Sequence, residues 1–278
     1  EHLWMYEGVT EYFANLFQVN QGLIDENEFF ERMAVKIAQS RQLNDNMSFT
    51  KMSKNVFDAP YKDQYLNVYQ KGALIAMCID IQMRESSKGT RGILSLMQDL
   101  SKEYGTNKAF KDSELFDKIT ELTYPEIGVF LNKHVSGETP IPYEFYFDKM
   151  GVTETTIEVA GNPFLKGQTE PYITVNPNTK EIIIIPGIEL NVFMTTLGIK
   201  NNDIIVAIND KDYNLDNIYD MIMASMSWKD GEAIAVKIKR DGKIQTLKGK
   251  VVMPKEKQES YQASDSAKKA VREAWLRG

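Results

Sequence analysis

The sequence predicts a multidomain α and β protein, in which a helical N-terminal half precedes a smaller β-rich part. Three observations lead to this fold class. The chain has 278 residues, which exceeds one domain of typical size, about 100–200 residues. Apolar residues recur at helical spacing through roughly the first half, whereas short β-rich runs separated by proline and glycine follow Gly137. Hydrophobic residues make up 42% of the chain, which is enough to build packed cores.

Three long helices are expected in the first half. Residues 7–20 place apolar side chains three and four positions apart, and residues 25–42 begin with Asp25, an N-cap with Glu28 three positions later. Residues 65–83 are apolar on most faces, which is typical of a helix buried in a bundle. Shorter helices are expected over 92–104, 113–122 and 125–134.

The second half predicts strands joined by tight turns. Strands are expected over 172–175, 181–185, 203–208, 233–239 and 244–252, with one helix over 215–226. Asp241 and Gly242 form the expected turn of a hairpin, because both tolerate a positive φ angle. The predicted organisation is a helical part over 1–140, a linker and loop region over 141–171, a β-rich domain over 172–254 and a charged, solvated tail over 255–278.

Composition and charge exclude several classes of function. Lysine and arginine number 33 against 39 acids, and this net charge of −6 argues against a nucleic-acid partner, which usually meets a basic face. The best apolar stretches, at 72–79 and 182–185, fall far short of the ~20 residues that a membrane-spanning helix needs. Cys78 is the only cysteine, so we expect neither an internal disulfide nor a cysteine-rich metal site.

The opening segment Trp4-Met5-Tyr6-Glu7-Gly8 carries the first sign of chemistry. Taken alone, Glu7 is an acid in the first turn of a helix, where the helix dipole favours it. The pattern Trp-x-x-Glu-Gly-x-x-x-Tyr, however, resembles the third-ligand segment of the gluzincin metallopeptidases. In those enzymes a His-Glu-x-x-His helix supplies two zinc ligands and the general base. The resemblance implies that Glu7 is a zinc ligand.

A second motif, Tyr69-Gln70-Lys71-Gly72-Ala73-Leu74, follows Glu7 by 62 positions (69 − 7). Taken alone, Tyr69 is a buried tyrosine of a core helix. The segment resembles the Tyr-x-Lys-Gly-Ala-Leu motif of the aminopeptidase branch of the same clan. The resemblance implies that the Tyr69 hydroxyl hydrogen-bonds the tetrahedral intermediate.

Residues 185–188 and 194–210 resemble the pattern of a bacterial PDZ domain, although Asn202 and Asp210 replace the usual glycines and no carboxylate-binding loop precedes Tyr172. The helical half of a thermolysin-like metallopeptidase catalytic domain, followed by a PDZ-like β-rich domain over 172–254, resembles the glycyl aminopeptidase family, up to about Pro254. The resemblance implies a zinc aminopeptidase that removes glycine or alanine from the N-termini of peptides. It further implies a peptide or protein ligand for the PDZ-like domain, and it favours a bacterial cell envelope or periplasm, although no targeting signal fixes the compartment.

The His-Glu-x-x-His motif itself does not occur, and the only histidines are His2 and His134. A catalytic zinc needs three protein ligands and an open position for water. We therefore expect the two-histidine helix to precede Glu1 in a longer protein, and this chain alone to be inactive. Glu11, one turn after Glu7, is expected to be a solvated or supporting acid. The alternative is a non-catalytic PDZ-type binding protein whose peptidase-like half is a scaffold.

Overall fold

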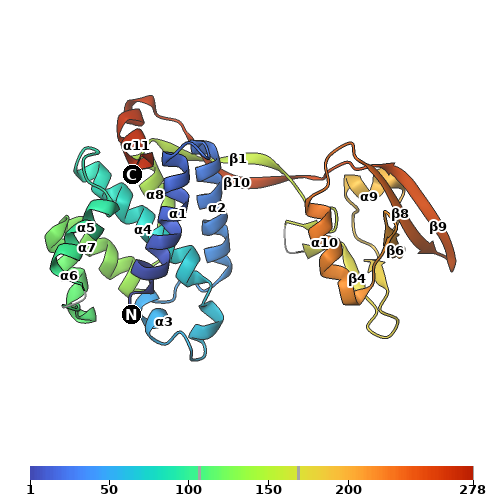
Figure 1. Ribbon diagram of the computed structural model, residues 1–278, viewed down its shortest axis with the longest axis horizontal. Helices are drawn as coiled ribbons and strands as arrows, with labels where there is room; N and C mark the ends of the chain where they lie inside the picture. The colour runs from blue at the N-terminus through green and yellow to red at the C-terminus, as the bar shows by residue number, and fades with distance from the viewer. Residues whose placement is uncertain (106–107, 168–169, 278) are drawn as a thin grey trace. The chain divides into compact units, whose positions relative to one another are not determined.

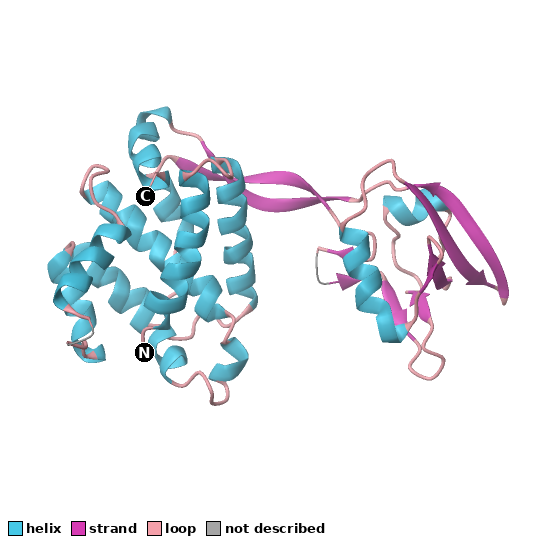
Figure 2. Ribbon diagram, in the orientation of Figure 1, coloured by secondary structure: helices cyan, strands magenta, loops and turns pink. Residues whose placement is uncertain are grey.

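The computed structural model describes residues 1–105, 108–167 and 170–277, and these form two compact units. Unit 1 comprises residues 1–156 and 259–278, and unit 2 comprises residues 157–258. Unit 1 is mostly helical and unit 2 mostly β-stranded (Figures 1 and 2). Unit 2 is therefore inserted into unit 1 along the chain. The strands β1 (Val152–Ala160) and β10 (Lys255–Ala263), at the two crossing points, pair with each other.

Unit 1 contains all six helices that the sequence predicts for the first half. Its helical segments are η1 (Trp4–Gly8), α1 (Val9–Asn20), α2 (Glu26–Gln42), α3 (Phe49–Lys54), η2 (Tyr61–Gln64), α4 (Asn67–Ser86), α5 (Ile93–Glu103), α6 (Asp112–Leu122), α7 (Pro125–Phe130), η3 (Leu131–Ser136), α8 (Tyr143–Lys149), η5 (Ser266–Lys268) and α11 (Lys269–Leu276).

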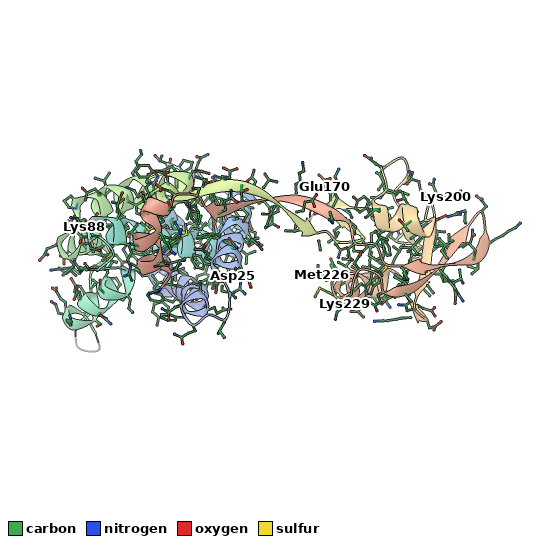
Figure 3. The ribbon with its side chains drawn as sticks, turned by 90° about the horizontal axis from the view of Figure 1, so that it is seen from above. Asp25, Lys88, Glu170, Lys200, Met226 and Lys229 are labelled. Carbon is green, nitrogen blue, oxygen red and sulfur yellow. The ribbon has the colours of Figure 1, made fainter. Side chains whose placement is uncertain are left out.

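Helix α4 is the centre of unit 1, as its all-round apolar sequence predicts. Helices α1, α2, α5, α7, α8 and α11 all pack against it. Cys78 is fully buried on this helix, which confirms it as a small core residue. The Asp25 carboxylate caps α2 as predicted, accepting a hydrogen bond of 2.9 Å from the Glu28 backbone N–H; Asp25 is labelled in Figure 3.

Two of the expected domain limits differ from the structure. Within the expected linker over 141–171 lies α8, whose Tyr143 and Phe147 are fully buried in the core of unit 1. The expected solvated tail over 255–278 is wrong, because β10 and α11 occupy it and Trp275 has no exposed surface. Both helices are only two turns long, so each shows too few apolar positions for a helical period to be recognised.

Unit 2 contains an antiparallel sheet in the order β4-β5-β6-β8-β9, with β7 paired to β6. Its strands are β4 (Ile173–Val175), β5 (Ile182–Ile184), β6 (Ile204–Ile208), β7 (Lys211–Asp212), β8 (Ala233–Arg240) and β9 (Lys243–Lys250). Two short strands, β2 (Leu165–Lys166) and β3 (Glu170–Pro171), precede the sheet in the sequence and pair with each other. The helical segments are α9 (Val192–Leu197), η4 (Leu215–Asn217) and α10 (Ile218–Met226).

The predicted hairpin is present in unit 2. Arg240 pairs with Lys243 at the end of the β8–β9 ladder, and Asp241 and Gly242 have φ angles of 50° and 75°. Buried and less buried residues alternate along β8, so that one face of the strand is buried while Lys237 and Lys239 lie on the opposite face. Unit 2 thus has its own hydrophobic core, separate from that of unit 1. In the part of the chain that the structure describes, no helix is both long and apolar enough to cross a membrane.

Candidate active site

The glycines of the two sequence motifs lie against each other in the structure. A Cβ atom on Gly8 would lie 2.3 Å from the carbonyl carbon of Gly72 and 2.5 Å from its oxygen. A Cβ atom on Gly72 would lie 3.0 Å from the Cα of Gly8 and 3.5 Å from that of Trp4. Any side chain at Gly8 would therefore force the backbones of η1 and α4 apart. These two glycines allow the two helical segments to cross in backbone contact.

This crossing brings Glu7 and Tyr69 to the same region. Glu7 immediately precedes Gly8, and Tyr69 lies three positions before Gly72, about one helical turn. Gly8 has helical φ and ψ angles of −67° and −47°, so η1 continues into α1 without a break. Residues 62 positions apart in the sequence thus sit on two helices whose relative position is fixed by a direct backbone contact.

The Tyr69 hydroxyl lies in an environment that keeps it protonated. It is 3.3 Å from the hydroxyl of Tyr65, and the two rings meet edge to face with centroids 5.9 Å apart. The hydrogen bond with Tyr65 is the largest influence on the pKa of Tyr69; partial burial and the negative charges of Glu7 and Glu11 add to it and raise that pKa to about 12. At neutral pH Tyr69 is therefore a hydrogen-bond donor.

Glu7 on η1 and Glu11 on α1 have different hydrogen-bond partners. Glu11 accepts a hydrogen bond of 2.6 Å from Lys36, a buried lysine that also lies 3.3 Å from the side-chain oxygen of Gln70. Glu7 is half-buried, and among the residues that the structure describes its carboxylate makes no hydrogen bond or ion pair. The charge of Glu11 is already compensated, while the carboxylate of Glu7 remains available for a ligand.

Sequence reasoning missed two lysines that hold this region together. Lys36 lies between Met33 and Ile37 on the apolar stripe of α2, and a lysine in such a stripe is a signal that an acid pairs with it. Lys71 is 2% exposed, and its ammonium donates to the carboxylate of Asp45 at 2.9 Å and to the Asp45 carbonyl at 2.8 Å. This ion pair fixes the loop before α3 against α4.

Neither histidine joins Glu7. The Nε2 atom of His2 lies 3.2 Å from the carbonyl of Asp112, its ring packs 5.2 Å from that of Phe116, and desolvation lowers its pKa. The Nδ1 atom of His134 lies 2.9 Å from the carbonyl of Thr139, so that this ring ties the end of η3 to the loop that follows.

The described residues do not fit a complete zinc site. Over residues 1–105, 108–167 and 170–277, no three histidine, cysteine, aspartate or glutamate side chains gather in a way that would hold a metal ion. Zinc takes three protein ligands in catalytic sites, and here only Glu7 is both available and placed beside Tyr69. Within the described part of the chain, the region thus holds one candidate ligand, Glu7, beside one hydrogen-bond donor, Tyr69.

A comparison with protein families finds a match that includes the candidate site. Residues 1–75 match the model of the M61 glycyl aminopeptidase family, which confirms the resemblance over that stretch. The match covers η1 and the start of α4, including the crossing at Gly8 and Gly72. It therefore includes both Glu7 and Tyr69.

A solved structure, that of an aminopeptidase N family protein from Idiomarina loihiensis, resembles the whole chain. It is 18% identical, has a TM-score of 0.55, and is matched over 99% of this chain and 48% of that chain. At this identity the likeness shows the fold alone, and this chain spans about half the length of the protein it matches. No curated protein matches the chain.

Proposed function

We propose that this chain is the C-terminal portion of a zinc aminopeptidase, similar to the glycyl aminopeptidases whose family model it matches over residues 1–75. In this proposal Glu7 is one of three zinc ligands and Tyr69 hydrogen-bonds the reacting oxygen. The observation that carries it is the Gly8–Gly72 contact, which brings the two motifs together with an available carboxylate on one helix and a protonated hydroxyl on the other.

The chemistry divides between the bound metal and the residues of this chain. Zinc, which Glu7 would hold together with two ligands from outside residues 1–278, would supply a Lewis acid for the scissile carbonyl and for water. Tyr69 donates a hydrogen bond to the oxygen that becomes negative as water adds to the carbonyl, and its raised pKa keeps the proton in place for this role. Lys36 compensates the charge of Glu11, so that one turn beyond the proposed ligand no second free carboxylate competes for cations.

The remaining ligands and the general base belong, in this proposal, to a His-Glu-x-x-His helix outside residues 1–278. The solved structure that resembles this chain is about twice as long, which leaves room for such a segment. The substrates would be peptides with N-terminal glycine or alanine, in a bacterial cell envelope or periplasm, as the family resemblance implies.

Unit 2 would be a PDZ-like domain that binds a peptide or protein. Its sheet with helices α9 and α10 is compatible with such a domain. In the described part of the chain, β4 pairs with β5 on one side and with no strand on the other, so that an added peptide strand could extend the sheet there. The alternative function, a non-catalytic PDZ-type scaffold protein, draws on this same edge.

Zinc binding and peptide hydrolysis test the proposal. Residues 1–278 alone should bind zinc weakly and should not hydrolyse glycyl or alanyl chromogenic substrates, because they supply one ligand and no general base. A longer form that carries the two-histidine helix should bind one zinc tightly and turn over both substrates.

Two results would contradict the proposal in different ways. Turnover, or one tightly bound zinc per chain, by residues 1–278 alone would show that the site lies elsewhere. A longer form that lacks the two histidines, binds no zinc, and yet binds peptides through unit 2 would support the scaffold instead.

A further inference from the structure

Helix α11, near the C-terminal end of the described chain, packs one face into the core of unit 1. Trp275 is fully buried, and its ring packs 5.6 Å from Phe29 and 6.1 Å from Phe30, measured between centroids. Arg272 is also buried, donates to the carbonyl of Met150 at 3.1 Å, and lies 3.5 Å from the carboxylate of Glu26. A helix held at two positions by buried groups has a defined orientation.

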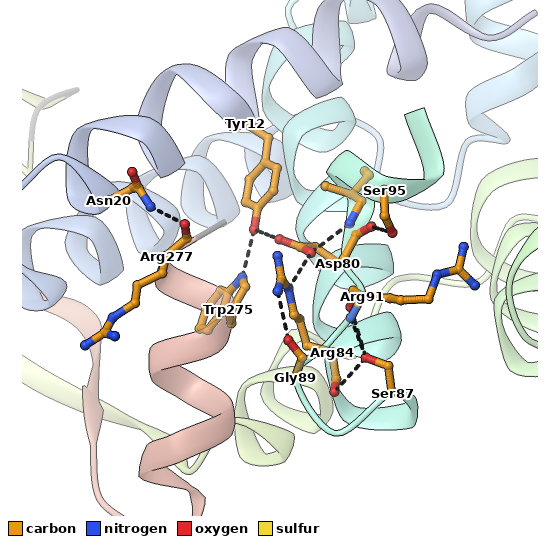
Figure 4. Close-up of polar contacts among 12 residues, drawn as sticks. Tyr12, Asn20, Asp80, Arg84, Ser87, Gly89, Arg91, Ser95, Trp275 and Arg277 are labelled. Carbon is orange, nitrogen blue, oxygen red and sulfur yellow. Dashed lines mark hydrogen bonds and ion pairs between the residues drawn. The ribbon is translucent and has the colours of Figure 1, made fainter. Parts of the chain in front are cut away.

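Trp275 begins a chain of hydrogen bonds that crosses the core (Figure 4). Its indole N–H donates to the Tyr12 hydroxyl oxygen at 2.7 Å, and that hydroxyl donates to the Asp80 carboxylate at 2.7 Å. The other oxygen of Asp80 accepts from the backbone N–H of Ile93 at 2.9 Å, and Arg84 lies 3.5 Å away. Tyr12, Asp80 and Trp275 have no exposed surface, so water cannot replace these partners.

Within this hydrogen-bond network, the bond from Tyr12 to Asp80 is a second fixed point between the helices that carry the candidate site, and Trp275 holds the Tyr12 hydroxyl in place. The first is the contact of Gly8 with Gly72. Tyr12 lies four residues beyond Gly8, about one turn, and Asp80 lies eight residues beyond Gly72, about two turns. One contact between two helices still permits rotation about it, whereas two contacts fix both the rotation and the sliding of one helix along the other.

We propose that Trp275 is a positioning residue: its hydrogen bond to Tyr12, continued to Asp80, sets the register of η1 and α1 on α4 and so holds Glu7 beside Tyr69. The importance of this register for catalysis rests on the proposed function, whereas the register itself does not. Residues at the two ends of the described chain would then jointly determine the site geometry.

The test uses the full chain, labelled with ¹⁵N and with ¹³C at the tyrosine ζ carbon, and compares NMR spectra of variants. Trp275→Phe keeps an aromatic ring but removes the N–H donor, and Tyr12→Phe removes the hydroxyl that links Trp275 to Asp80. Both should shift the resonances of Glu7, Gly8 and the Tyr69 ring by more than the linewidth. The double variant should shift them no further than Tyr12→Phe alone, because Tyr12→Phe already breaks the one bond that Trp275→Phe removes.

Trp228→Phe is the matched control, since it makes the same ring replacement at a partly buried tryptophan packed against the core of unit 2 and should leave these resonances unchanged. Shifts confined to α11 and the rings around it, with Glu7, Gly8 and Tyr69 unmoved, would overturn the proposal and leave Trp275 a packing residue. Shifts in Tyr12→Phe but none in Trp275→Phe would likewise overturn it, because Tyr12→Phe also breaks the bond to Asp80. If Trp275→Phe does not fold, Trp275→Met, which fills the site with an adaptable apolar side chain and also lacks the N–H donor, decides the question.

A longer form with the two-histidine helix gives a separate kinetic readout. There Trp275→Phe should lower kcat at least about 10-fold with KM and zinc content unchanged, because small misplacements of reacting groups cost up to ~10²-fold in rate. An unchanged kcat would contradict a positioning role. Inactivity of the wild-type long form would instead refute the proposed function, and the NMR result would still stand.

Discussion

Gly8 and Gly72 control how closely the two motif helices approach. Gly8→Ala should lower the free energy of unfolding of unit 1 by about 1–3 kcal/mol, since its Cβ would overlap the Gly72 carbonyl group and force the helices apart. Urea denaturation followed by circular dichroism measures this loss. Gly105→Ala is the control, because a Cβ there would have no atom of a described residue within 4 Å apart from its chain neighbours. Equal stability of the two variants would contradict the backbone contact.

The Tyr69 hydroxyl is expected to affect rate and not metal content. In the longer, zinc-loaded form, Tyr69→Phe should lower kcat by ~10²–10³, the usual cost of one lost oxyanion donor, with little change in KM. Glu7→Gln, by contrast, should reduce the zinc content. Elemental analysis and steady-state kinetics of both variants measure these effects. A Tyr69→Phe variant that keeps its rate, or that loses zinc as Glu7→Gln does, would refute the assignment.

The buried carboxylate of Asp80 should make stability depend on pH. Desolvation raises its pKa, although the hydrogen bond from Tyr12 and the charge of Arg84 oppose this. Since the folded-state pKa lies above the unfolded value of about 3.9, the stabilisation is complete below that pH. It is lost as the pH rises through the folded-state pKa.

The free energy of unfolding of the wild type, minus that of Asp80→Asn, should therefore decrease from about pH 3.5 to pH 7. Urea titrations across this range measure the difference. Asp99→Asn is the opposite control, because a hydrogen bond from Lys102 lowers the pKa of Asp99 and the corresponding difference should not decrease. A flat or increasing difference for Asp80 would contradict this account.

At the scale of elements, α11 is a structural part of unit 1. A chain that ends at Asp265 should lose at least about 3–5 kcal/mol of stability in unit 1, the usual cost of removing one buried tryptophan side chain. Thermal denaturation followed by far-ultraviolet circular dichroism measures the loss. Lys269→Ala, on the exposed face of the same helix, should change stability by less than about 0.5 kcal/mol. Similar melting temperatures for the truncated and full chains would show that α11 contributes little.

At the scale of the whole molecule, one backbone cut should not separate the fragments. Lys166 is exposed and offers trypsin a site between β2 and β3. The C-terminal fragment would retain α11, which packs in the core formed by residues 1–156. The cut protein should therefore elute as one species in native gel filtration and separate only in denaturant. Separation without denaturant would indicate that α11 does not hold the fragments together.

The sequence by itself predicted the long helices, the principal strands and the β8–β9 hairpin, because each depends on local periodicity, capping or turn chemistry. It also identified the motifs containing Glu7 and Tyr69, since these residue types at this spacing resemble a known family. The sequence could not show why each motif contains a glycine, because Gly8 and Gly72 meet only when two segments that are distant along the chain pack together.

Only the tertiary structure decided what α8, α11 and the buried polar groups do. Trp275 reads locally as part of a charged tail, and it becomes a core residue because Tyr12, Phe29 and Phe30 surround it in space. Lys36 likewise looks like an exception in an apolar stripe until Glu11 faces it. The physical reason is the same in both cases. Burial of a tryptophan or a charge is determined by partners that lie far away along the chain, and a local pattern, even where it signals a partner as at Lys36, does not identify which residue it is.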